Sequence, residues 1–263
     1  MTVSSSSHLR LLAPRTEAGF TLTELAVVVL IVGLLLGGLL VTLDAQNTAR
    51  TIAETRQILQ NAHDAVIGFA VSNGRLPCPA TAGSNGLESP VTPPAPPAAN
   101  PCTVTKGFLP AATLGIGPTD AQGYLLDSWN NRIRYAVTTT DSNAYTTAGK
   151  MREKAFNVNP SAILKICASA NASAAAAQTA CPSGVEIETP AVIFSTGKNG
   201  SSGPASFDEI ENTDDFFAAT NTDRIFVTHD LTTAEATSGV FDDVVTWISP
   251  NVLFHRMISA GAQ

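Results

Sequence analysis

The longest apolar stretch of the chain covers residues 25–41 and contains no charged side chain. Its 17 residues would form about 26 Å of helix, close to the hydrocarbon thickness of a bilayer. One carboxylate, Glu24, stands directly before the stretch. The pattern predicts a membrane-spanning helix. A secretory signal peptide is a poor alternative, because residues 43–45, Leu-Asp-Ala, do not form a small-x-small cleavage site.

A second pattern follows directly and is amphipathic. Apolar side chains recur at helical spacing, while most charged side chains lie on other faces. The apolar positions are Ala45, Ala49, Ile52, Leu59, Ala62, Val66 and Phe69. We therefore expect one helix from about Thr21 to Ser72, with a transmembrane half in residues 20–43 and an amphipathic half in residues 44–73. Gly74 supplies the stop signal.

The remainder, residues 74–263, is expected to form a head built on a small β-sheet. Short segments rich in β-branched residues alternate with clusters of Gly, Asn, Asp and Ser, which is typical of strands joined by turns. The predicted strands are 133–139, 162–168, 191–195, 224–228 and 243–248. Because no long helices separate them, the sheet should be largely antiparallel and should pack on the amphipathic half of the long helix. The expected fold class is α+β.

The residues that precede the apolar stretch carry a motif. Residues 19–24 read Gly-Phe-Thr-Leu-Thr-Glu. Glycine, phenylalanine and glutamate at this spacing, followed at once by a long apolar helix, resemble the processing site of type IV prepilins and of the pseudopilins of type II secretion. The resemblance implies a pilin-like fold and a leader, residues 1–19, that a prepilin peptidase removes by cutting after Gly19. It also implies that the new N-terminal residue, Phe20, is methylated.

The position of Glu24 at the edge of the apolar stretch needs an explanation. Placing a carboxylate inside hydrocarbon costs about 2.5–3.5 kcal/mol of free energy, so such a group usually has a partner. The resemblance implies that this partner is the N-terminal amine of Phe20 in a neighbouring subunit, which would fix the stagger between subunits. Alternatively, Glu24 lies at the level of the lipid headgroups. Arg10 and Arg15 before the apolar stretch predict a cytoplasmic N-terminus. The resemblance then implies a single-pass protein of the bacterial inner membrane with a periplasmic head.

A second resemblance lies at the start of the predicted sheet. Residues 127–135 read Asp-Ser-Trp-Asn-Asn-Arg-Ile-Arg-Tyr and are similar to the D-x-W-G-N-x-x-R-Y signature of pseudopilin heads. Asn130 replaces the usual glycine. Asp127 and Asn131 suit a turn, and Tyr135 suits the strand that follows.

The four cysteines are Cys78, Cys102, Cys167 and Cys181. Their spacing matches no zinc site, and outside the cytoplasm an even number of cysteines indicates disulfide bonds. Three connectivities are possible. The pairing of neighbours in sequence is favoured, because it closes two low-complexity loops, one rich in proline and one rich in alanine.

Charge and composition exclude some partners. The formal net charge is −7, and no cluster of Lys and Arg occurs, so nucleic-acid binding is not expected. The acidic residues of segment 197–215 could supply oxygen ligands for calcium, as a loop of major pseudopilins does. Their spacing matches no EF-hand, so a solvated acidic loop without metal or cofactor is favoured.

No arrangement typical of an enzyme is present, since the histidines are scattered and no G-x-S-x-G sequence occurs. The expected function is that of a structural subunit, a minor pilin or pseudopilin, assembled with other pilin subunits into a type IV pilus or a type II secretion pseudopilus. The alternative is a single-pass, membrane-anchored periplasmic binding protein that is not assembled. An uncleaved N-terminus and tolerance of Glu24→Gln would indicate that alternative.

Overall fold

The structure is a computed structural model, in which the chain divides into two compact units, Met1–Thr48 and Ala49–Gln263. Side chains of residues 36–45 are not described. The described residues are 19–91, 101–151, 164–170, 179–182, 186–214, 216–217, 223–232 and 239–261.

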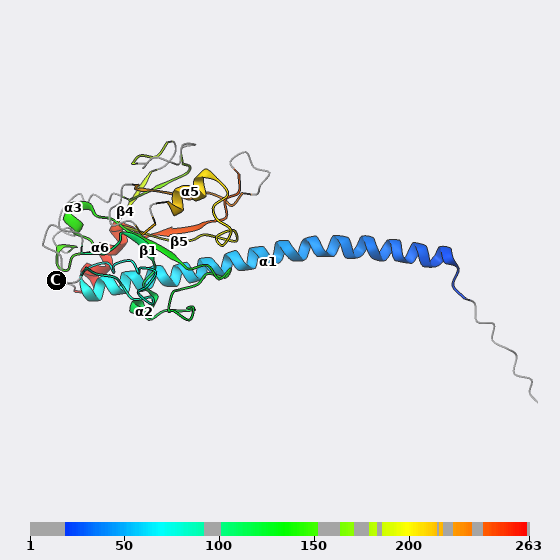
Figure 1. The fold of residues 1–263 in the computed structure, drawn as a ribbon, viewed down its shortest axis with the longest axis horizontal. Helices are drawn as coiled ribbons and strands as arrows, with labels where there is room; N and C mark the ends of the chain where they lie inside the picture. The colour runs from blue at the N-terminus through cyan, green and yellow to red at the C-terminus, as the bar shows by residue number, and fades with distance from the viewer. Residues whose placement is uncertain are drawn as a thin grey trace, which may run out of the picture. The chain divides into compact units, whose positions relative to one another are not determined.

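The predicted long helix is present as α1, Leu22–Asn73 (Figure 1). It ends where Gly74 adopts φ 64° and its N–H donates to the carbonyl of Ala70 at 2.9 Å. Only glycine enters this left-handed conformation without a steric penalty, so Gly74 acts as the expected stop. The buried face of α1 within the second unit comprises Thr55, Leu59, Ala62, Val66, Ile67 and Ala70. The predicted apolar face is therefore confirmed at Leu59, Ala62 and Val66. Ala49, which was also predicted to lie on it, is exposed.

A four-stranded antiparallel sheet forms the middle of the second unit. Its strands are β1 (Lys106–Phe108), β2 (Arg134–Val137), β5 (Ala191–Ser195) and β7 (Val244–Trp247), in the order β1-β2-β5-β7. The register places Tyr135 opposite Ile193 and Val192 opposite Trp247. The prediction of antiparallel pairing is confirmed for this sheet. β1 has only three residues, too few to show an alternating pattern in the sequence.

A second sheet has three strands, β4 (Ile187–Thr189), β3 (Leu164–Cys167) and β6 (Ile225–Val227), in that order. β3 and β4 pair antiparallel, whereas β3 and β6 pair parallel. The parallel pair departs from the antiparallel expectation. It arises because β3 and β6 are distant in sequence, so no hairpin turn sets their relative direction.

Side chains alternate between the two faces of the four-stranded sheet and so build two hydrophobic layers. Tyr135 and Ile193 face a core that contains Leu59 and Val66 of α1. Ala136 and the other alternate residues pack instead against the three-stranded sheet, in a cluster that contains Leu164, Ile166, Val192, Phe194 and Phe226. The four-stranded sheet is therefore covered by helix on one side and by strands on the other.

The other helices that the structure describes are short and lie in the second unit. They are α2 (Ala111–Leu114), α3 (Thr140–Asn143), α5 (Phe207–Thr213) and α6 (Pro250–Ser259). α6 adds Leu253, Phe254 and Met257 to the core of α1, and Figure 1 shows it beside the C-terminal part of that helix. The sequence analysis predicted none of these four helices.

The 127–135 motif forms a turn held by Asp127. Its Oδ1 accepts hydrogen bonds from the main-chain N–H groups of Trp129 at 2.9 Å and Asn131 at 2.7 Å. Its Oδ2 accepts one from the Ser195 hydroxyl of β5 at 2.6 Å. Asn130 has φ 66°, a conformation that glycine prefers and that asparagine tolerates better than most residues. The replacement of glycine at this position therefore preserves the turn.

Candidate functional site

The predicted processing site lies immediately before α1. Gly19 and Phe20 are outside any helix or strand, and the side chain of Phe20 is 85% exposed. A β-carbon added to Gly19 would meet no atom within 4 Å. Gly19 and Phe20 are thus both exposed in the part of the chain that the structure describes.

Thr21 and Glu24 form a reciprocal cap at the start of α1. The Thr21 main-chain N–H and its hydroxyl both donate to Oε2 of Glu24, each at 2.8 Å. In return, the Glu24 N–H donates to the Thr21 hydroxyl at 3.3 Å. This is the capping-box arrangement, in which two N–H groups without helical partners are satisfied. Sequence reasoning missed this role of Thr21, although the spacing T-x-x-E carries the signal.

The first half of α1 presents apolar side chains to its surroundings. Those at least 45% exposed include Leu22, Leu25, Val27, Val28, Val29, Leu30, Ile31, Val32, Leu34 and Leu35. Such a continuous apolar surface is typical of a helix that contacts lipid or other helices. In the part of the chain that the structure describes, no helix has an apolar segment long enough to cross a membrane. Residues 36–41 of the predicted span lie outside the described side chains.

Comparison with protein families supports the interpretation of this segment. Residues 14–40 match the prokaryotic N-terminal methylation motif, which is the prepilin-type cleavage and methylation signal. No curated protein and no solved structure matches the chain. The motif supports a type IV pilin-like or pseudopilin-like protein, and it implies processing by a prepilin peptidase. It points to a structural protein rather than to an enzyme.

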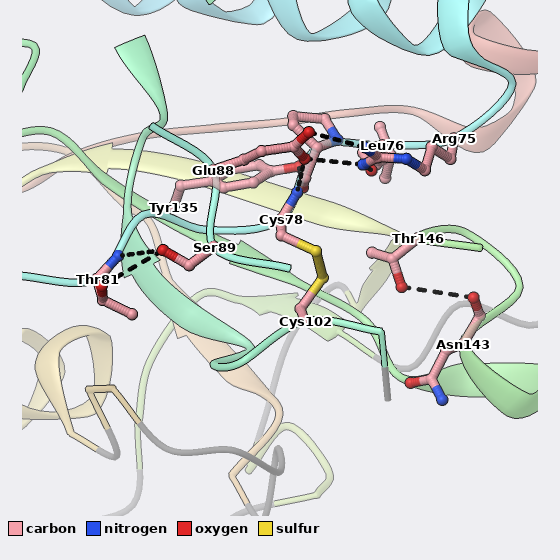
Figure 2. The surroundings of a disulfide bond; sticks show 11 residues. Arg75, Leu76, Cys78, Thr81, Glu88, Ser89, Cys102, Tyr135, Asn143 and Thr146 are labelled. Carbon is pink, nitrogen blue, oxygen red and sulfur yellow. Dashed lines mark hydrogen bonds and ion pairs between the residues drawn. A yellow bond between two sulfur atoms is a disulfide. The ribbon is translucent and has the colours of Figure 1, made fainter. Parts of the chain in front are cut away.

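The first disulfide of the head joins Cys78 to Cys102 and lies beside a half-buried ion pair (Figure 2). Arg75 donates two parallel hydrogen bonds to the carboxylate of Glu88, each at 2.8 Å. The Cys78 N–H donates to the same carboxylate at 3.1 Å. Burial alone would raise the pKa of Glu88, but the hydrogen bonds from Arg75 and Cys78 outweigh it and hold that pKa below its usual value.

The second disulfide joins Cys167, at the end of β3, to Cys181. Both bonds follow the pairing that the sequence analysis favoured. Residues 92–100 of the first closed loop and residues 171–178 of the second lie outside the described part of the chain. Because the sulfurs are paired, the cysteines act here as structural links.

The acidic segment 197–215 is not the solvated loop that the sequence analysis favoured. Residues Phe207–Thr213 form α5, which Ser206 caps by accepting a hydrogen bond from the Glu209 N–H at 3.3 Å. Asp208, Glu209 and Glu211 are 8%, 1% and 0% exposed, whereas Phe207 is 51% exposed. The helix thus turns its carboxylates inward. Asp215 lies outside the described residues.

Polar partners from distant parts of the chain make this burial possible. Glu209 accepts hydrogen bonds from the Ala205 N–H at 2.6 Å, the Asn199 amide at 2.8 Å and the Asp242 N–H at 3.0 Å. Asp208 lies 3.2 Å from Nε2 of His229. Since these partners are spread along the sequence, the burial could not be read from the segment itself.

Among the described residues of the head, two groups of carboxylates have oxygens within 4.8 Å of one another. They are Glu209 with Asp242 and Asp243, and Glu211 with Asp214 and Asp223. Calcium takes such oxygen ligands, but protonation is another way to relieve the repulsion. Burial and neighbouring carboxylates raise the pKa of Asp243 to about 8, that of Asp242 to about 6 and that of Glu211 to about 8. The sequence analysis favoured no metal in this segment and kept calcium as the alternative, and both stay predictions.

Proposed function

We propose that this chain is a minor pilin or pseudopilin, a structural subunit assembled into a type IV pilus or a type II secretion pseudopilus. The match of residues 14–40 to the prepilin-type signal is the observation that carries the proposal. On this proposal, a prepilin peptidase removes residues 1–19, and Phe20 becomes a methylated N-terminus. The large head with its two closed loops favours a minor subunit over a major one.

Residues 25–41 would hold the protein in the bacterial inner membrane before assembly, with the N-terminus in the cytoplasm and the head in the periplasm. Two features support this placement. The apolar side chains of the first half of α1 are exposed and would gain free energy by contact with lipid. The disulfides Cys78–Cys102 and Cys167–Cys181 suit an oxidising compartment such as the periplasm.

Assembly would use the same end of α1. After cleavage, the free amine of Phe20 would lie one residue before Thr21, whose N–H already donates to Glu24. We infer that Glu24 of one subunit pairs with the amine of Phe20 in a neighbouring subunit, because an opposite charge offsets the burial of both groups. The partners of the whole chain in the filament would be other pilin subunits. On this proposal, the role uses no cofactor.

Shearing of surface filaments tests assembly. The full chain would be expressed in cells that also make the peptidase and the other pilins, and the sheared fraction would be probed for the chain. We expect the wild type in that fraction and Gly19→Val in the membrane fraction only. Recovery of the wild type from the membrane alone, while another pilin of the same cells is sheared, would contradict assembly into a surface pilus.

A further inference from the structure

Arg134, the first residue of β2, has a guanidinium group without a hydrogen-bonding partner among the described residues. The group stacks on the ring of Phe216, with Cζ 4.1 Å from the ring centroid. Within the described residues, no acceptor lies within hydrogen-bonding distance of its side chain, and no carboxylate is within 4.0 Å. Burial lowers the pKa of Arg134, an effect that the nearby charge of Asp243 partly offsets. An arginine in such surroundings normally donates several hydrogen bonds.

Two other arginines of the head, in contrast, donate hydrogen bonds to side chains of the chain. Arg75 forms a bidentate ion pair with the carboxylate of Glu88. Arg132 donates from Nε to Asp120 at 2.7 Å and from Nη2 to Gln122 at 2.7 Å. Arg134 is therefore exceptional among these three, and its donors are available to a molecule outside the chain.

Arg134 lines a hollow on the surface with a volume of about 230 Å³. The other lining residues include Phe108, Asn130, Asn131, Arg132 and Thr196. The amide of Asn131 is committed to the carbonyl of Gly197, at 2.6 Å. Asn130, in contrast, is exposed and has no hydrogen bond from its amide to a described residue. The lining thus offers donors and an aromatic ring but no carboxylate.

We propose that this hollow binds a small organic carboxylate, with Arg134 as its charge partner and Asn130 as a second donor. The balance of charge favours a single carboxylate. Arg132 is paired with Asp120, at 2.6 Å, whereas Arg134 has no carboxylate within 4.0 Å among the described residues and feels the charge of Asp243 only from farther away. The planar fork of Arg134 matches the two oxygens of a carboxylate. The site is independent of filament assembly and gives the head a ligand of its own.

Lactate and lactamide provide a matched pair of probes, because they share a shape and differ in charge. Each would be titrated into the full chain in detergent, and binding would be followed by saturation-transfer NMR and calorimetry. We expect lactate to bind and lactamide to bind at least about tenfold more weakly, since a charge-assisted hydrogen bond is lost. Arg134→Gln should weaken lactate binding by a similar factor.

Two further variants keep the test decisive. Asn130→Asp places a negative charge in the lining, leaves Arg134 intact and keeps a residue type that tolerates the left-handed conformation at this position. It should also abolish lactate binding, even if Arg134→Gln fails to fold. Arg50→Gln removes a charge from an exposed arginine of α1 and should leave binding unchanged. No binding to the wild type, equal binding of lactamide, or binding unaffected by Asn130→Asp would overturn the proposal.

Discussion

Thr21 and Glu24 satisfy each other's main-chain N–H groups at the first turn of α1, through contacts of 2.8 Å and 3.3 Å. The carboxylate of Glu24 is thereby held beside Thr21, the second residue after the predicted cleavage point. A helix N-terminus stabilises a negative charge, so Glu24 can remain ionised until it meets a partner. Capping and charge pairing are separable roles for this side chain.

Glutamine at position 24 separates these two roles. Glu24→Gln retains an acceptor for the Thr21 N–H and so keeps the cap, but it removes the charge that would attract a neighbouring amine. We expect normal cleavage and at least about a tenfold loss of chain from sheared filaments, because an ion pair is lost in a medium of low polarity. Glu24→Ala, which removes both roles, should be no better. Full incorporation of Glu24→Gln would show that the cap alone matters.

The Arg75–Glu88 pair should stabilise the head. Glu88→Gln leaves a half-buried guanidinium with a neutral partner and should lower the free energy of unfolding by about 2 kcal/mol. Because the pKa of Glu88 is lowered on folding, this stabilisation is present above its unfolded value of 4.5 and is lost as the pH falls through the folded value. Thermal unfolding followed by near-ultraviolet circular dichroism would measure the difference. Glu54→Gln, in an exposed pair, should change stability by less than about 0.5 kcal/mol.

The buried carboxyl of Asp243 should make the head less stable at alkaline pH. Its pKa rises from 3.8 to about 8 on folding, chiefly through burial. The folded state therefore keeps a proton that the unfolded state loses, and the free energy of unfolding falls as the pH rises through this window. Asparagine does not titrate, so the free energy of unfolding of Asp243→Asn lacks this pH dependence. The difference between variant and wild type should therefore shift in favour of the variant as the pH rises to 8, by about 1 kcal/mol or more. A difference that does not vary with pH would contradict this reasoning.

The two disulfides should differ in their contribution to stability. The bonds span 24 and 14 residues of sequence, and the loop-entropy model gives about 3 kcal/mol for loops of this size. Replacing both Cys78 and Cys102 by alanine should cost about 0.5 kcal/mol more than replacing Cys167 and Cys181. The midpoints of thermal unfolding of the two double variants, compared with the wild type, provide the measurement. The reverse order would show that strain or local packing dominates.

Local sequence patterns predicted the parts of the fold that depend on local order. α1, Leu22–Asn73, follows from a long periodic pattern that ends at Gly74. β2 and β5 were predicted because their β-branched residues stand between clear turn signals. The three-residue strands β1 and β4 carried no comparable pattern. The parallel pairing of β3 with β6 is a property of the folded chain, and no local signal encodes it.

The polar interior of the head was beyond prediction from the sequence for a related reason. Glu209 and Asp243 resemble solvated acids in the sequence, and only the fold places them among Asn199, Asn212 and other donors. That Arg134 has no hydrogen-bonding partner among the described residues is likewise visible only in the folded chain. At the processing site, in contrast, the cleavage motif, the apolar stretch and the T-x-x-E cap are all local. The sequence was therefore most informative about the N-terminal segment.

Intact mass and N-terminal sequencing of the chain from membranes that contain a prepilin peptidase test the central claim most directly. The account predicts a mature protein that begins at methylated Phe20. Gly19→Val should keep its original N-terminus, whereas Gly33→Val, in the apolar part of α1 where a β-carbon meets no atom within 4 Å, should be processed like the wild type. A wild-type chain that still begins at Met1 or Thr2 would contradict the account.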